Sequence, residues 1–167
     1  MGRMRRELYL SAIYHVYNRG NNRMNVFPDR TDKEKFLELI VRYRERFGFM
    51  VYAICLMDNH YHMLIKASHK HPISRIMQVL MLSYSNHYRR KYKYEGHVWQ
   101  SRYKSRVIER EKYLFECIDY IHENPVKSEI VKAAGDYPYS SARVFEGRSP
   151  EVGECLTIDS LKEALYS

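Results

Sequence analysis

The sequence has few cysteines and no long apolar run, and each shortage excludes a class of protein. Cys55, Cys117 and Cys155 are odd in number and far apart, which predicts reduced thiols in a cytoplasmic protein and excludes a zinc motif of paired cysteines. No apolar run reaches the length of a membrane span, so no membrane partner is expected. The basic N-terminus lacks the apolar stretch of a signal peptide.

Internal repeats and linkers are also missing, so the chain is expected to fold as one domain, residues 1–167. Hydrophobic residues make up 45% of it, which argues against disorder over most of its length. From about residue 136 the pattern becomes loop-rich. In this C-terminal extension the sequence predicts only a short helix near Leu161.

Positive charge is in excess, with 28 Lys and Arg residues against 20 acids and a formal net charge of +8. Seven cations gather where Glu95 is the only acid: Arg89, Arg90, Lys91, Lys93, Arg102, Lys104 and Arg106. Six aromatic residues interleave with them: Tyr84, Tyr88, Tyr92, Tyr94, Trp99 and Tyr103. Cations between aromatic rings favour binding of single-stranded nucleic acid, because an unstacked base gains about 1–3 kcal/mol on such a ring. A solvated charged face is the alternative.

Hydrophobic periodicity predicts the secondary structure. Strands are expected at residues 11–18, 49–57, 60–67 and 98–109, and helices from Thr31 or Asp32 to Phe47, from about 72 to 92, and from 111 to 124. Gly48 and Pro125 are expected to end the first and last helices. The first six elements spell βαββαβ, the ferredoxin-like pattern, which is an α+β fold with helices on one face of an antiparallel sheet. The other face is left for a substrate, a partner or the last helix.

Two histidines, His60 and His62, begin the strand predicted at 60–67. Residues two apart in a strand point to the same side, so both imidazoles share one face while Tyr61 and Met63 enter the core. Neutral imidazoles placed in this way can bind one divalent ion. The pair lacks a third ligand, and eight histidines make a chance His-x-His common enough that two surface residues are the alternative.

The helix predicted at 111–124 can supply both a third ligand and a nucleophile. Tyr120 and Asn124 are four apart and share a helix face, so a helix on the free sheet face would carry them over the histidines. Tyrosine can act as a covalent nucleophile, and an amide oxygen suits a hard ion such as Mg²⁺ or Mn²⁺. The alternatives are a core aromatic and a simple helix terminus.

The strand predicted at 98–109 places Arg102, Lys104 and Arg106 on one side by alternation. Such a row can follow a DNA backbone. Charges that protect an exposed strand edge against aggregation are the alternative.

Several of these segments together resemble a known family. LMDNHYHMLIK resembles the His-hydrophobic-His motif of the HUH superfamily of single-strand endonucleases, and YIHENPVKSEIV resembles the tyrosine-bearing segment of its single-tyrosine transposases. With HVWQSRYKSRVI and DYPYSSARVF, they are similar to REP-associated tyrosine transposases and related insertion-sequence transposases over residues 15–145. The resemblance implies a ferredoxin-like, metal-dependent enzyme that cuts single-stranded DNA beside a hairpin, with Mg²⁺ or Mn²⁺ as cofactor.

The resemblance also implies residue roles. His60, His62 and Asn124 would be metal ligands, with Glu123 as the rival of Asn124, and Tyr120 would be the nucleophile. Attack by Tyr120 would leave a 5′-phosphotyrosine link and a free 3′-hydroxyl, so that strands can be rejoined without ATP. One nucleophile per chain means that two cleavages need a homodimer or two successive turnovers. A cytoplasmic, nucleoid-associated protein is expected.

Two other functions are compatible with the residues. The first is a non-catalytic single-stranded nucleic-acid-binding protein, because ferredoxin-like sheets also bind RNA by stacking. The second is a metal-dependent hydrolase in which water attacks and Tyr120 is structural.

Overall fold

The computed structural model describes residues 9–148 and 151–157. A four-stranded antiparallel sheet forms its centre, in the order β2-β3-β1-β4. The strands are β1 (Ile13–Arg19), β2 (Met50–Leu56), β3 (His60–Lys66) and β4 (Lys104–Val107), and the long helices are α1 (Arg30–Phe47), α2 (Ile73–Tyr92) and α3 (Glu111–Lys127). The predicted α+β, ferredoxin-like βαββαβ order is confirmed.

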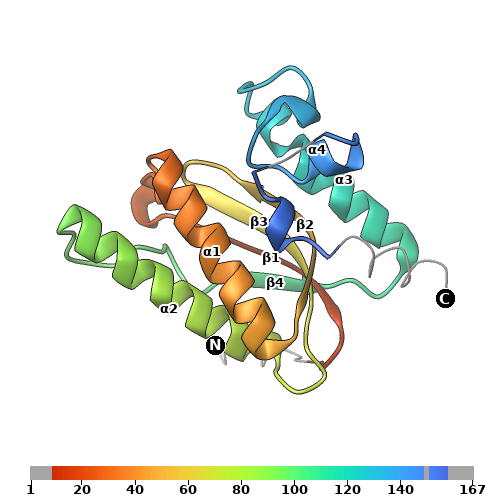
Figure 1. Ribbon diagram of the computed structural model, residues 1–167, viewed down its shortest axis with the longest axis horizontal. Coiled ribbons are helices and arrows are strands. Elements are labelled where there is room, and N and C mark those ends of the chain that lie inside the picture. The colour runs from red at the N-terminus through yellow and green to blue at the C-terminus, as the bar shows by residue number, and fades with distance from the viewer. Residues whose placement is uncertain (1–8, 149–150, 158–167) are drawn as a thin grey trace, which may run out of the picture.

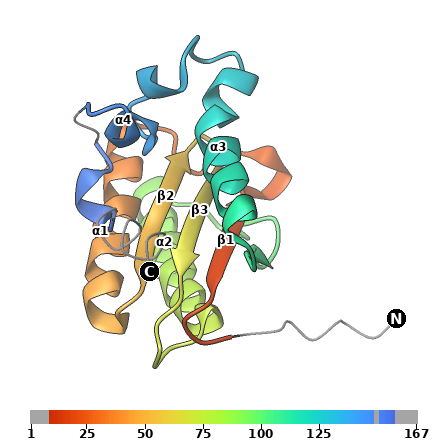
Figure 2. The ribbon, with the colours of Figure 1, turned by 90° about the vertical axis from the view of Figure 1, so that its right-hand side faces the viewer.

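Helices cover both faces of the sheet. Figures 1 and 2 show α1 and α2 on one side and α3 on the other. Among the described residues beyond α3 lie one short helix, α4 (Ala142–Phe145), and two 3₁₀ turns, Ala134–Asp136 and Gly153–Cys155; a further turn, Asn21–Arg23, follows β1. None of the described helices is long and apolar enough to cross a membrane.

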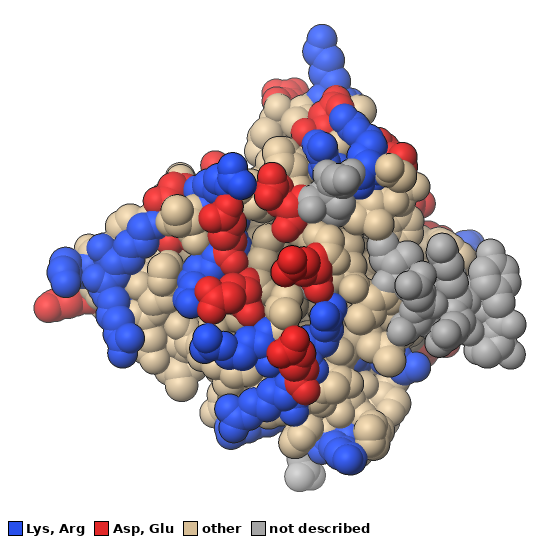
Figure 3. Space-filling model, viewed as in Figure 1, with Lys and Arg blue, Asp and Glu red and all other residues tan. Residues whose placement is uncertain are grey.

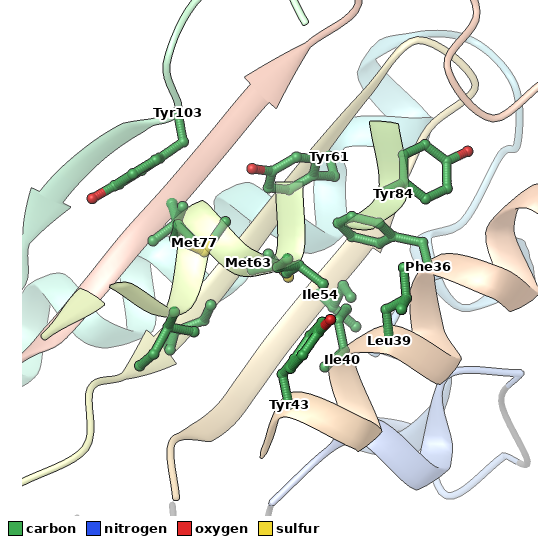
Figure 4. Packing of buried hydrophobic residues seen from close by; sticks show 14 of the residues in the cluster. Phe36, Leu39, Ile40, Tyr43, Ile54, Tyr61, Met63, Met77, Tyr84 and Tyr103 are labelled. Carbon is green, nitrogen blue, oxygen red and sulfur yellow. The ribbon is translucent and has the colours of Figure 1, made fainter. Parts of the chain in front are cut away.

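Two apolar layers hold the helices to the sheet. The larger one lies under α1 and α2 and includes Tyr61 and Met63, as the strand alternation predicts (Figure 4). The Tyr61 hydroxyl is satisfied there, because it donates to Met81 Sδ at 3.2 Å. The smaller layer joins Ile118 and Ile121 of α3 to the other face of β2 and β3. The side chains that alternate with the first core set therefore face α3.

Three predicted boundaries are wrong. Only Lys104–Val107 of the strand predicted at 98–109 is a strand, because the chain before it bends to bury Trp99 and Tyr103 in the larger core. The last helix continues through Pro125 to Lys127, since a proline in the final turn removes only one backbone donor. Asp29, rather than Thr31 or Asp32, caps α1, and its carboxylate accepts from the Asp32 N–H at 3.0 Å.

Other boundaries agree with the sequence. Gly48 ends α1 in the left-handed conformation at φ 69°, as predicted. The helix predicted near Leu161 lies outside the described residues.

Candidate functional site

A pocket of about 600 Å³ lies between α3 and the sheet, where β1 ends and β3 begins. It is lined by Tyr17, Asn18, Arg19, Arg23, Asn59, His60, His62, Gln100, Ser101, Lys104, Tyr120 and Asn124. The structure therefore brings the predicted nucleophile and all three predicted metal ligands to one pocket. Glu123, the rival of Asn124, is exposed and is not part of the lining.

Helix α3 carries its polar face over the histidine pair. The Tyr120 ring meets the His62 ring edge-on, with 5.4 Å between centroids, and 45% of Tyr120 remains exposed. One turn further on, Asn124 Oδ1 lies 3.2 Å from His60 Nε2. The Asn124 amide nitrogen donates back to the Tyr120 carbonyl at 3.3 Å, which orients the oxygen towards His60.

His60 has amide oxygens on both ring nitrogens. Its Nδ1 lies 2.6 Å from Asn59 Oδ1, and its Nε2 faces Asn124. Burial lowers the pKa of His60, so the ring is neutral at pH 7 and carries one proton. Only one of the two contacts can then be a hydrogen bond. If Nδ1 donates to Asn59, two lone pairs face each other at 3.2 Å across Nε2 and Asn124 Oδ1.

A divalent ion would resolve this opposition of lone pairs. Ligand bonds of about 2.1 Å at a right angle put two donor atoms about 3 Å apart, close to the observed separation. His62 presents its ring to the same pocket. Among the described residues, no group of three His, Cys, Asp or Glu side chains is placed to hold a metal. The three ligands predicted from the sequence would offer two imidazoles and one amide oxygen from this lining.

His15 of β1 was missed in the sequence. Its Nε2 lies 3.0 Å from His62 Nδ1, and the two rings stack with centroids 5.2 Å apart. Burial lowers the pKa of His62 to about 3 and that of His15 to about 4, with Arg106 adding to the second shift. The alternation of His15 with buried Tyr14 and Val16 placed it on the α3 face, but only the register of β1 on β3 brings it to His62.

Two cations of the predicted row share this face of the sheet. Lys104 pairs with Tyr17 across the strands, and its ammonium lies 5.9 Å from the Tyr17 ring. Arg106 pairs with His15. Both cations are exposed, and Arg102 is exposed in the bend before β4, outside the strand in which it was predicted.

The other four predicted cations end α2 or follow it, and α2 lies on the opposite face of the sheet (Figure 1). Lys91 is held by ion pairs to Asp29 at 2.7 Å and Asp32 at 3.1 Å. Arg89 donates to the Gly96 carbonyl, while Arg90 and Lys93 are exposed. The structure does not bring these four to the pocket. Figure 3 shows acidic side chains among the basic ones on the side formed by α1.

The predicted stacking role of the interleaved aromatics is wrong for most of them. Four are buried and cannot receive a base: Tyr84, Tyr88, Trp99 and Tyr103. Tyr92 is exposed, but its hydroxyl donates to the buried Asp32 carboxylate at 2.5 Å. These rings mainly build the core beneath α2.

Known proteins match this chain in sequence and in fold. The family model described as transposase, IS200-like, matches residues 9–124. A Haemophilus influenzae protein described as a REP-associated tyrosine transposase is 31% identical over 134 residues, which cover 70% of this chain and 75% of that protein.

Two solved structures share the fold. The structure of a REP-associated tyrosine transposase bound to a REP hairpin superposes with a TM-score of 0.72 at 20% identity, covering 90% of each chain. A Deinococcus radiodurans protein described as a transposase gives a TM-score of 0.50 at 17% identity, covering 74% of this chain and 95% of the other. The family match spans most of the sequence and the curated relative spans more than two thirds of it, so this chain belongs to the IS200-like transposase family and is a transposase of the REP-associated tyrosine transposase type.

Proposed function

We propose that this transposase cuts and rejoins single-stranded DNA beside a hairpin, with Tyr120 as the nucleophile and a divalent ion, Mg²⁺ or Mn²⁺, bound by His60, His62 and Asn124. One observation carries the proposal: α3 holds Tyr120 over the histidine pair of its own chain, in a pocket open to solvent. Tyr120 and Asn124 are one helical turn apart, so the same face of α3 presents the proposed nucleophile and a proposed metal ligand.

In the proposed reaction one phosphate ester bond replaces another, so no bond energy is lost to hydrolysis. The Tyr120 oxygen loses its proton to solvent and forms a bond to the scissile phosphorus. The bond from phosphorus to the 3′ oxygen of the preceding nucleotide breaks, and that oxygen takes up a proton. The 5′-phosphate then remains on Tyr120 as an ester, so a 3′-hydroxyl can attack it and rejoin strands without ATP.

The residues around Tyr120 prepare this step. Asn59 holds His60, and the Tyr120 carbonyl holds the Asn124 amide, so both proposed ligands are oriented before substrate arrives. When bound, the divalent ion supplies positive charge next to the non-bridging phosphate oxygens, where negative charge increases during attack. Because each chain has one proposed nucleophile, two cleavages need two protomers or two successive turnovers.

The cations around the pocket suit a single strand that leads to Tyr120. Lys104 lines the pocket, Arg106 follows it on the same face, and Arg102 precedes both. The hairpin is supported by the similar transposase bound to a REP hairpin. Arg90 and Lys93, at the end of α2, are exposed and lie away from the pocket. We assign them contacts with a part of the DNA more distant from Tyr120.

Covalent capture on a gel tests the proposal. With Mn²⁺ and a labelled hairpin carrying a single-stranded flank, the wild type should give a protein–DNA adduct that protease destroys. Tyr120→Phe should bind the DNA and give no adduct. Tyr113→Phe is the matched control, because Tyr113 is similarly exposed on α3 and should react as the wild type does. Cleavage without any adduct would point to attack by water, and binding without cleavage to a non-catalytic protein.

A further inference from the structure

His15 contacts His62, one of the proposed metal ligands, without lining the pocket itself. It contacts the rings of His62, Tyr17 and Tyr120. Its Nε2 lies 3.0 Å from His62 Nδ1. This contact joins His15 directly to a proposed metal ligand.

Two neutral imidazoles in hydrogen-bond contact can arrange their protons in two ways. If His62 Nδ1–H donates to His15, then His62 Nε2 has a free lone pair and can bind a metal. If His15 Nε2–H donates to His62, then the only proton of the His62 ring is on Nε2, and that nitrogen cannot be a ligand. The direction of the hydrogen bond between His15 and His62 therefore decides whether His62 Nε2 can bind a metal.

The other ligand shows the same construction. Asn59 Oδ1 lies 2.6 Å from His60 Nδ1 and can only accept, which leaves His60 Nε2 towards the pocket. His15 occupies the corresponding position behind His62. Metal-bound histidines commonly donate their second N–H to such a partner.

We propose that His15 is a positioning residue, which accepts a hydrogen bond from His62 Nδ1–H and thereby fixes the Nε2 lone pair of His62 towards the metal. The inference rests on the proposed function, since it assigns a task to a residue behind the proposed ligand. It also predicts a tautomer that exists before metal or DNA binds.

Metal affinity and the tautomer can both be measured without DNA cleavage. Titration calorimetry with Mn²⁺ should show about 10–100-fold weaker binding for His15→Phe, which keeps a ring but has no acceptor. His15→Gln should restore binding to near the wild-type value, because a carboxamide oxygen can replace the acceptor. His69→Phe is the control, because His69 is exposed and lies beyond the far end of β3.

Nitrogen-15 NMR of the metal-free protein reports the tautomer of His62 directly. The wild type and His15→Gln should carry the proton on Nδ1, and His15→Phe should show the Nε2–H form. The inference is overturned if wild-type His62 is protonated on Nε2, if His15→Phe binds Mn²⁺ as the wild type does, or if His15→Gln is as weak as His15→Phe. Wild-type protein that binds no Mn²⁺ would overturn the proposed metal site as well, whereas normal wild-type binding with an unaffected His15→Phe variant overturns this inference alone.

Discussion

The cations of β4 should set the salt dependence of DNA binding. Lys104 and Arg106 are exposed on the α3 face of the sheet, two residues and roughly 7 Å apart along the strand. Changing both to Gln removes two positive charges beside the pocket and no buried contact. If each side chain neutralises one phosphate, the double variant should lose two counterion-releasing contacts.

The size of the effect follows from the charge of single-stranded DNA. Each phosphate contact contributes about 0.7 to the slope of log affinity against log salt, so the slope should flatten by about 1.4. If the two proteins bind equally at 1 M salt, the variant should bind about 25-fold more weakly at 0.1 M. Adding Arg102→Gln should bring the flattening to about 2.

Fluorescence anisotropy of a labelled single strand, measured over a series of salt concentrations, gives the slope. The control is Lys70→Gln with Arg75→Gln, which removes the same charge from exposed residues that follow the far end of β3. An unchanged slope in the β4 variant, or an equal flattening in the control, would refute a specific contact between β4 and the DNA backbone.

The remaining predictions concern metal binding and stability. His60→Ala with His62→Ala should abolish the Mn²⁺ heat signal while the protein stays folded, and a surviving signal would place the metal elsewhere. Burial lowers the pKa of His122 to about 4, so between about pH 6.5 and pH 4 the unfolded chain binds a proton that the folded one does not. Over this range the free energy of unfolding should fall by about 1.4 kcal/mol per pH unit from this group as the pH drops. Urea titrations at several pH values should show that His122→Gln loses this part of the pH dependence, and a pH dependence equal to that of the wild type would contradict the assignment. Ile121→Ala, at a fully buried position of α3, should cost about 2–5 kcal/mol of unfolding free energy, and a loss under about 1 kcal/mol would mean that α3 packs loosely.

Local spacing was enough to group the proposed nucleophile and the proposed metal ligands into two pairs. A two-residue period places His60 and His62 on one face of a strand, and a four-residue step places Tyr120 and Asn124 on one face of a helix. Both relations are fixed by backbone geometry within one element. Both relations hold in the structure, and α3 lies on the sheet face that α1 and α2 leave free.

Contacts between segments far apart in the sequence could not be predicted from the local residue pattern. His15 meets His62 because β1 pairs with β3, and nothing in either segment alone specifies that register. Lys91 was expected to contact DNA, and the pattern gave no sign of the ion pairs that it forms with Asp29 and Asp32 from the start of α1. Trp99 supports an alternating pattern in sequence, yet the chain bends there to bury the ring, and burial of a large aromatic outweighs extension of an edge strand.

Identification of the residue that becomes attached to DNA tests the central claim most directly. After reaction with a cognate hairpin, digestion of the adduct with nuclease and trypsin should leave a nucleotide on the peptide from Tyr113 to Lys127, and fragmentation in the mass spectrometer should place it on Tyr120. The label should stay with the protein when it is on the 3′ side of the cut, because the 5′-phosphate is retained. Attachment at Tyr113 or at any residue outside α3, or a label retained from the 5′ side, would contradict the proposed reaction.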